Sequence, residues 1–356
     1  MRIGKAILFL SALVWCSCSP MGNRFDPYSS STTSKEGFET VKLDGGIKPE
    51  DLLPSKEPFR LGPGDKLEIE VLHEEGTLKQ CWVMPDGKLY YMALQGQLVS
   101  NLKVQEVKVL LEKGLREFYK NPQVSVVLRG VSSRRVWILG RVNTPGLYPI
   151  ESPMTVLEGI SKAGGLFTSR FSGTTEELAD LRHSFLIRKG EFMPVDFYKL
   201  IKEGDLSQNV YLQDGDYVYL PSALSQEVYV MGAVKQPKAI GFSDQVTLVS
   251  VVAGAGGLLP GAYAQRAVIV RGSLNEPTVA TVNLNLILHG EQPDVALQPR
   301  DIVWIPNSPW ERIENYAKLI INSFVKTVAA NEGTHAASKS GQNVQPSIGI
   351  GGSGSK

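Results

Sequence analysis

The middle of this chain carries one sequence pattern twice, and this duplication constrains the fold more than any other feature. Residues 136–140 recur as residues 228–232, an offset of 92 (228 − 136). A second match closes each unit, at Pro221 and at Pro306, with an offset of 85 (306 − 221). The first unit therefore holds about seven extra residues, which we place within 174–183. A repeat of this length predicts two copies of one packed module.

Each unit has the pattern of a strand, a turn, a short helix and two further strands. In the first unit we expect a helix from Thr155 to Ala163, with Thr155 as its N-cap and a glycine pair as its stop. A helix packed across a small mixed sheet fits this order, so the predicted fold class is α+β. The residues that we assign to structural turns in the repeats are Gly140, Gly164, Gly165, Gly232, Gly256 and Gly257.

A smaller α+β domain is expected before the repeats. Gly62, Gly64 and Asp65 form a turn, and the alternation of polar and apolar residues over 66–71 predicts a half-buried strand. A β-hairpin is expected over residues 83–91, centred on Asp86-Gly87, and residues 103–119 have one apolar face, which predicts a helix.

The N-terminus has the features of an export signal. Residues 1–18 combine positive charges with an apolar run that is too short to cross a bilayer as a helix. Cys18, which follows the small Ser17, is the preferred lipidation site, and Cys16 is the alternative. Ordinary cleavage without a lipid also fits. Residues 19–56 are polar and rich in Ser and Thr, and we expect a tether with little capacity to form a core.

A helix is expected near the C-terminus, over residues 308–330, with two unlike faces. The apolar face, which could meet lipid, holds Trp310, Ile313, Ala317, Ile320, Phe324 and Val328. The polar face, which could line a water-filled lumen, holds Glu311, Asn315, Lys318, Asn322 and Lys326. One such helix would not cross lipid cheaply, but a ring of them could. A helix docked on its own domain, or lying flat on a membrane, remains an alternative.

Composition excludes several classes of function. The net charge is +1 and no basic stripe occurs, so nucleic acid is not an expected partner. The four histidines are scattered, and we expect neither a metal nor another cofactor. The close acidic pairs Glu74-Glu75, Glu176-Glu177 and Asp214/Asp216 fit turns or solvated surface better than a glycosidase site, so we expect no enzyme. Cys81 is expected in a buried strand.

The residues quoted above, together with Asn121-Pro122 and the Gly215-Asp216 turn, resemble the outer-membrane polysaccharide-export family of capsule and exopolysaccharide lipoproteins. The first domain resembles its polysaccharide-export domain, and the repeats resemble its soluble-ligand-binding β-grasp (SLBB) module. The second repeat departs from this pattern at Pro299-Arg300-Asp301, and the first domain departs at Tyr91-Met92, where the family usually has a proline.

The resemblance implies a homo-oligomeric conduit, an octamer, that passes a polysaccharide through the outer membrane with an inner-membrane co-polymerase or tyrosine kinase as partner. A lipid on Cys18 would anchor a mostly periplasmic body, with the C-terminal tail outside the cell. The alternative is a periplasmic carbohydrate-binding lipoprotein without a pore. The expected division of the chain is: signal peptide 1–18, tether 19–56, export domain 57–132, SLBB repeat 1 at 133–225, SLBB repeat 2 at 226–307, amphipathic transmembrane helix 308–330 and disordered tail 331–356.

Overall fold

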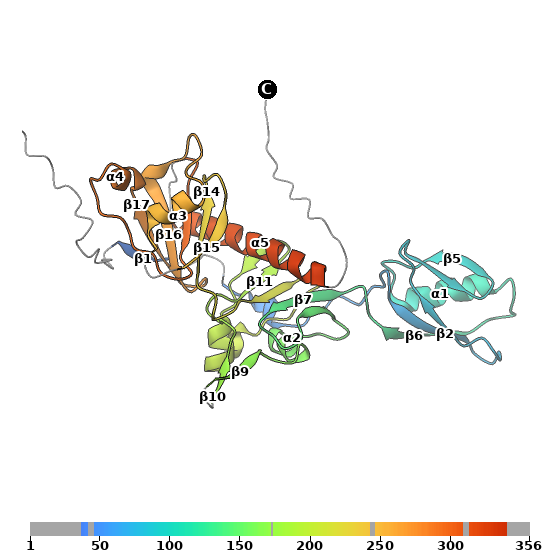
Figure 1. The fold of residues 1–356 in the computed structure, drawn as a ribbon. Helices are drawn as coiled ribbons and strands as arrows, with labels where there is room; N and C mark the ends of the chain where they lie inside the picture. The colour runs from blue at the N-terminus through green and yellow to red at the C-terminus, as the bar shows by residue number, and fades with distance from the viewer. Residues whose placement is uncertain (1–36, 42–45, 172–173, 243–245, 309–312, 340–356) are drawn as a thin grey trace, which may run out of the picture.

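The computed structural model describes residues 37–41, 46–171, 174–242, 246–308 and 313–339 (Figure 1). Cys16, Cys18, Trp310 and Glu311 lie outside the described residues. The first α+β domain, with α1 and β2, lies at one end of Figure 1, and the two repeats lie at the other.

The export domain is a three-stranded antiparallel sheet, in the order β3-β2-β6, with one face covered. Its strands are β2 Lys66–Val71, β3 Lys79–Trp82 and β6 Val124–Gly130. The helix α1 Val104–Leu115 and the pair β4 Lys88–Tyr91 and β5 Leu94–Leu98 lie over that face. As expected from the alternation, β2 buries Leu67, Ile69 and Val71 against them. Each such side chain contributes roughly 1.5–3 kcal/mol by leaving water.

The prediction of a hairpin at Asp86-Gly87 was wrong: the turn is present, but the strands on its two sides belong to different sheets. The N–H of Met84 donates to the carbonyl of Lys88 at 2.8 Å, and Gly87 has φ of +77°. The strands on either side, β3 and β4, pair with β2 and β5 respectively. Local turn chemistry therefore identified the reversal of the chain, but it does not specify the pairing partner.

The two repeats have the same topology. In repeat 1 (residues 133–225) the sheet order is β12-β11-β13-β7-β8, with β13 parallel to β7. Its elements are β7 Arg135–Gly140, β8 Gly146–Pro149, α2 Val156–Lys162, β11 Phe185–Arg188, β12 Glu191–Met193 and β13 Tyr217–Leu220, with single turns at η2 Lys199–Glu203 and η3 Leu206–Gln208. Its helix lies on one face of the sheet, over the core that includes Val136, Ile138 and Leu186.

Repeat 2 (residues 226–307) repeats this order as β17-β16-β18-β14-β15, again with its closing strand β18 parallel to its first strand β14. Its elements are β14 Glu227–Gly232, β15 Lys238–Gly241, α3 Leu248–Gly254, η4 Ala264–Arg266, β16 Ala267–Gly272, β17 Pro277–Val282, α4 Leu284–Leu288 and β18 Ile302–Ile305. The duplicated sequence thus forms a duplicated fold.

The expected helix caps are confirmed in both copies. Thr155 precedes α2, its Oγ1 accepts the N–H of Glu158, and the Glu158 carboxylate accepts the N–H of Thr155 at 2.7 Å. Thr247 caps α3 in the same way, with Ser250 as its partner. Such reciprocal bonds satisfy N–H groups that a helix leaves free at its start.

The extra residues of repeat 1 form a hairpin that repeat 2 lacks among its described residues. The strands β9 Thr168–Phe171 and β10 Thr174–Glu177 pair antiparallel with each other. This location overlaps the 174–183 segment expected from the change of offset.

The segment expected to be a free tether differs from that expectation where it is described. Strand β1 Phe38–Thr40 pairs with β17 at the edge of the repeat 2 sheet (Figure 1). The short helix η1 Pro49–Leu52 docks on repeat 1, where the Asp51 carboxylate accepts from Arg188 at 2.7 Å. Backbone pairing and a single ion pair leave no periodic signal in a polar sequence, so this docking was not predicted.

The C-terminal helix α5 spans Ile313–Lys339, so it continues beyond the expected end at residue 330. Residues 331–339, expected to be disordered, are helical. Glu332 is half-buried, and the Thr334 hydroxyl donates to the carbonyl of Ala330 at 2.7 Å. Within the described residues, no helix combines the length and apolar character needed to cross a membrane.

Candidate functional site at the seam between the repeats

The helix α5 lies between the sheets of the two repeats, and we call this contact region the seam (Figure 1). Repeat 1 contributes the face of its sheet opposite α2, and repeat 2 contributes the face opposite α3. Each sheet is therefore covered on both faces, which explains why β11 and β16 are almost continuously buried. The buried residues of the seam include Phe185, Ile187 and Tyr219 of repeat 1, Val268, Val270 and Ile302 of repeat 2, and Ala317, Ile320, Ile321, Phe324 and Val325 of α5.

The expected apolar face of the helix is therefore covered by protein in this structure. Ala317, Ile320 and Phe324 are buried in the seam, and Val328 packs against it. Ile321 and Val325 are buried too, because a helix that contacts two sheets needs a wider apolar face than one stripe. The side chains of Ile313 and Asn315 lie outside the described residues. The prediction that this face contacts lipid applies to a helix that has left the seam, and it stays a prediction.

The residues of the expected polar face have two different environments. Lys318 and Lys326 are exposed, as a solvent-facing or lumen-facing position requires. Asn322 instead accepts the backbone N–H of Phe192 in repeat 1 through its Oδ1 at 2.8 Å. Two further bonds fix the helix: the Tyr217 hydroxyl donates to the carbonyl of Ala329, and the Trp304 indole donates to the Tyr316 hydroxyl at 2.7 Å. The seam thus holds α5 by specific polar contacts as well as by apolar burial.

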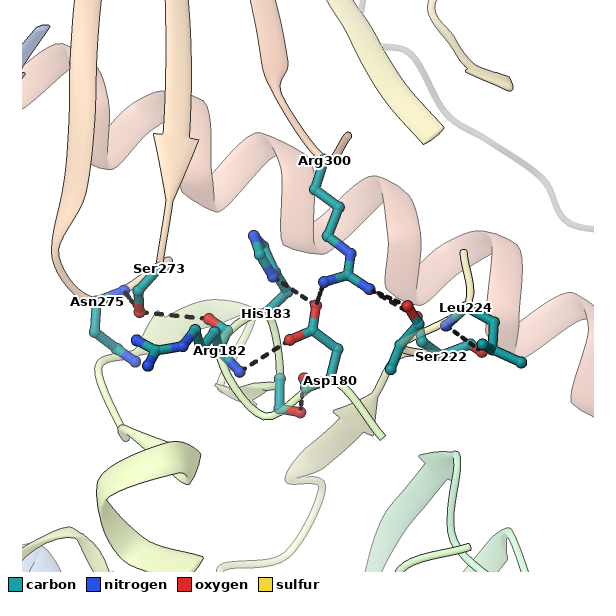
Figure 2. A network of polar contacts seen from close by, with 10 residues as sticks. Asp180, Arg182, His183, Ser222, Leu224, Ser273, Asn275 and Arg300 are labelled. Atoms are coloured by element: carbon teal, nitrogen blue, oxygen red, sulfur yellow. Dashed lines mark hydrogen bonds and ion pairs between the residues drawn. The ribbon is translucent and has the colours of Figure 1, made fainter. Parts of the chain in front are cut away.

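A polar network closes the seam on one side (Figure 2). The Asp180 carboxylate of repeat 1 accepts from Arg300 of repeat 2 at 2.5 Å and lies 2.6 Å from Nδ1 of His183. The Arg300 guanidinium also donates to the carbonyl of Ala223 at 2.8 Å and to that of Ser222 at 3.2 Å. Arg300 therefore contacts both a charge and the backbone of the opposite repeat.

Electrostatics favour the ionised form of Asp180. Burial alone raises the pKa of this carboxyl, but the hydrogen bond and charge of His183, followed by the charge of Arg300, outweigh burial. The pKa of Asp180 consequently lies below its ordinary value. The contact between Asp180 and Arg300 is therefore an ion pair at neutral pH.

Arg300 occupies a position that repeat 1 gives to a glycine. Gly215 is its equivalent, with φ of +80°, and Arg300 adopts the same left-handed conformation, with φ of +72°. This conformation costs an L-residue roughly 1–2 kcal/mol. The charge-assisted bonds to repeat 1 offset that strain. The turn at which the second copy has an arginine in place of the glycine is thus one of the places where the copies are joined.

A small cavity lies beside this network, between the two sheets and α5. Its lining includes Phe185, Tyr219, Tyr229, Phe324 and the polar residues of the network. Its volume of about 30 Å³ has room for water but not for a sugar ring. Burial raises the pKa of the Tyr219 and Tyr229 hydroxyls, which stay neutral. This cavity is therefore too small to be a glycan pocket.

The turns predicted in the three domains share one construction. Asp65, Asp216 and Asp301 are all fully buried, and each accepts the backbone N–H of the residue three positions earlier at 2.8 Å. In the repeats each carboxylate also pairs with an arginine, Asp216 with Arg188 and Asp301 with Arg271.

Asp65 serves a related purpose without an arginine. Its carboxylate accepts the N–H groups of Ser132 and Ser133 at 2.8 and 2.9 Å, and so ties the export domain to the segment that leads into repeat 1.

The glycines predicted at turns have left-handed φ values, with the exception of Gly62. Gly64, Gly140, Gly164, Gly165, Gly232, Gly256 and Gly257 all have φ between +79° and +92°. At Gly62 the constraint is space, since an added Cβ would lie 2.5 Å from Cβ of Ser133.

The remaining candidate residues form no reactive centre among the residues that the structure describes. Glu74 and Glu75 are exposed, and Asp214 accepts the backbone N–H of Arg135 at 2.8 Å. The side chains of Glu176 and Glu177 lie outside the described set. No group of three or more His, Cys, Asp or Glu in the described chain could hold a metal ion. Cys81 is buried, as predicted, and burial raises the pKa of its thiol.

Sequence reasoning did not identify Asp180, His183 or Arg300 as a site. One signal was available, because Arg300 replaces the glycine of the first copy at a turn that requires a left-handed residue. Asp180 and His183 follow the extra hairpin of repeat 1. Tyr263 is the counterpart of Asp180 in repeat 2, since the N–H of each donates to the carbonyl of the closing proline, and the two residue types differ.

Comparison with known protein families assigns the chain to a class. Residues 134–220 and 226–305 each match the family described as "SLBB domain", and residues 53–129 match "Polysaccharide biosynthesis/export protein". Together with the relatives below, these matches show that the chain belongs to the polysaccharide-export family that carries SLBB repeats.

Two relatives are similar along most of the chain, and a third is similar along about a third of it. The EPS I polysaccharide export outer membrane protein EpsA of Ralstonia nicotianae is 27% identical over 88% of this chain and 94% of its own length. EpsA of Ralstonia solanacearum is 26% identical with the same coverage. The exopolysaccharide production protein ExoF of Rhizobium meliloti is 33% identical over 32% of this chain and 30% of its own.

Proposed function

We propose that this chain is the subunit of an outer-membrane conduit that exports a capsular or extracellular polysaccharide and performs no bond chemistry. The observation that carries the proposal is the ordered match of three domains, extended by relatives named as outer-membrane export proteins along 88% of the chain.

The proposal includes an assembled ring. Homo-oligomerisation, an octamer, a lipid on Cys18 and an inner-membrane co-polymerase partner follow from the family resemblance. In the ring, α5 would cross the outer membrane with its apolar face toward lipid and with Lys318 and Lys326 toward the lumen. The exposed position of these two lysines is compatible with that arrangement.

In this proposal α5 leaves the seam, and its departure changes the surfaces of the repeats. Ile320, Ile321 and Phe324 would exchange a protein environment for lipid, and both environments are apolar. The vacated sheet faces would expose Phe185, Val268 and other seam residues, which favours water-excluding contacts with a neighbouring subunit. Insertion of α5 is therefore coupled to assembly in this proposal.

A second function is favoured by a specific observation. Because α5 is docked in the seam, the chain as described is a closed body, which suits a periplasmic carbohydrate-binding lipoprotein without a pore. Such a protein would bind glycan with its helix in place.

Labelling of intact cells separates the two. A single cysteine is introduced by Ser347→Cys, with Cys81→Ser as background, and cells are treated with a membrane-impermeant maleimide. Labelling without permeabilisation places the tail outside the cell and supports the conduit. Labelling only after permeabilisation leaves the tail in the periplasm, which overturns the membrane-crossing helix and supports the binding lipoprotein.

A further inference from the structure

The export domain has one sheet face that nothing in the described chain covers. Its buried face packs on α1 and on the pair β4-β5, so the opposite face of β3-β2-β6 points outward. Figure 1 shows α1 and β5 together on one side of β2 and β6. We call the opposite side the outer face. Its residues alternate with those of the core and include Lys66, Glu68, Gln80, Trp82, Val127 and Arg129.

An indole ring stands at one end of the outer face. Trp82 is 53% exposed although it lies in a strand, directly opposite Lys66 in the register of β2 and β3. The Lys66 ammonium lies 5.4 Å from the centre of the ring. An exposed tryptophan leaves a large apolar surface in water, so it gains free energy from any ligand that covers it.

Polar groups fixed in place surround the ring. Glu68 lies opposite Gln80 in β3 and opposite Val127 in β6. Arg129 donates to the Glu68 carboxylate at 2.7 Å, and Gln80 lies next to Glu68 on the neighbouring strand. This bond holds a carboxylate and a guanidinium on the same sheet face as the indole, with the amide of Gln80 beside them. Val127, 40% exposed, continues the apolar part.

This combination of groups fits a sugar chain. A pyranose presents C–H bonds on its faces and hydroxyls at its edge, so its face packs on the π-surface of an indole while its hydroxyls bond to fixed polar groups. Lys66 lies beside the ring and Glu68 lies on the same face, and both residue types are depleted in the cores of protein interfaces. The charges on this face balance, since Glu68 and Glu70 offset Lys66 and Arg129. A nucleic acid would need a positive surface, so the face does not suit one.

We propose that the outer face of the export domain is a contact site for the exported polysaccharide, with Trp82 as the stacking platform and Gln80, Glu68 and Arg129 as hydroxyl partners. The inference rests on the proposed export function and adds to it a location for the substrate. A platform of one ring with shallow polar contacts binds a single sugar unit weakly, which allows a moving chain to be released.

Calorimetric titration of the full chain, purified in detergent, tests the site. The probe is the extracellular polysaccharide of cells that carry this chain, purified and cleaved to oligosaccharides. Trp82→Ala is compared with the control Trp137→Ala, whose indole is 39% exposed on repeat 1. We expect Kd to rise about tenfold for W82A and to stay within about twofold for W137A. Gln80→Ala, which removes no apolar surface, should raise Kd by a smaller factor.

Three results overturn the inference. One is absence of binding by the wild-type chain, and the second is an unchanged Kd in W82A. The third is an altered oligomer size in W82A with an unchanged Kd, which would identify the face as a contact between subunits. Deletion of the chain from cells reports separately on the proposed function. If secretion of polysaccharide continues after deletion, the export role fails, whatever W82A binds.

Discussion

At the scale of single residues, two glycines determine how each repeat closes. Gly140 and Gly232 end the first strand of their repeats with φ of +92° and +85°. A Cβ at Gly140 would lie 2.0 Å from the carbonyl oxygen of Leu220, and one at Gly232 would lie 2.1 Å from that of Ile305. In both cases the obstacle is the backbone of the parallel partner strand, which cannot rotate away. Only glycine permits that approach.

Gly140→Ala should therefore destabilise repeat 1. We expect a loss of about 2–4 kcal/mol, because the methyl group meets both a backbone clash and a left-handed φ. Gly146→Ala is the matched control, since nothing lies within 4 Å of its added Cβ and its φ is not left-handed. The midpoints of urea unfolding measure both. Equal midpoints for the two variants would contradict this account of the strand ends.

At the scale of elements, α5 shows what an apolar stripe can and cannot predict. The stripe was visible in the sequence, and the structure confirms that Ala317, Ile320 and Phe324 lie on one buried face. A stripe predicts burial, but burial in lipid and burial in protein require the same residues. The bond from Phe192 to Asn322 and the hydroxyl of Tyr217 distinguish the docked state, and they depend on residues distant in sequence.

Neighbouring positions on α5 test this docking. Ile320 is fully buried in the seam, whereas Leu319 is 48% exposed. Ile320→Asn should destabilise the two-repeat body by about 3–5 kcal/mol, because it removes an apolar contact and buries an amide. Leu319→Asn should change stability by about 0.5 kcal/mol or less. Urea unfolding of the chain in detergent gives both values, and an equal loss in the two variants would argue against the seam.

At the scale of the whole molecule, the repeats are joined by the helix and by polar contacts, among which the pair of Asp180 with Arg300 is the more buried ion pair. The pKa of Asp180 is lowered in the folded chain, so its carboxylate contributes stability that is present above its unfolded pKa of about 3.8. This contribution is lost as the pH falls below that value, because the proton removes the charge that Arg300 and His183 require.

The stability of the wild-type chain should accordingly decline steeply as the pH falls below about 4. Asp180→Asn should flatten that decline. At neutral pH it should lower the free energy of unfolding by about 1–3 kcal/mol, since the polar groups of the seam lose a charged acceptor. Arg300→Gly, which restores the turn residue of repeat 1, should flatten the same part of the curve. Urea midpoints measured from about pH 2 to about pH 7, a range that extends below the ordinary pKa of an aspartate, check this. An unaltered slope in both variants would mean that the contact does not couple the repeats.

The sequence by itself determined the features that depend on nearby residues. The duplication, the threonine caps of α2 and α3, the alternation of β2 and the turn glycines all follow from local chemistry, and the structure has each of them. Only the tertiary structure decided what covers each face. The pairing of β1 with β17, the contact of Asp51 with Arg188 and the insertion of α5 between two sheets all join distant segments. Hydrophobic burial has no direction, so a pattern of apolar residues specifies that a surface must be covered and leaves its partner to the folded chain.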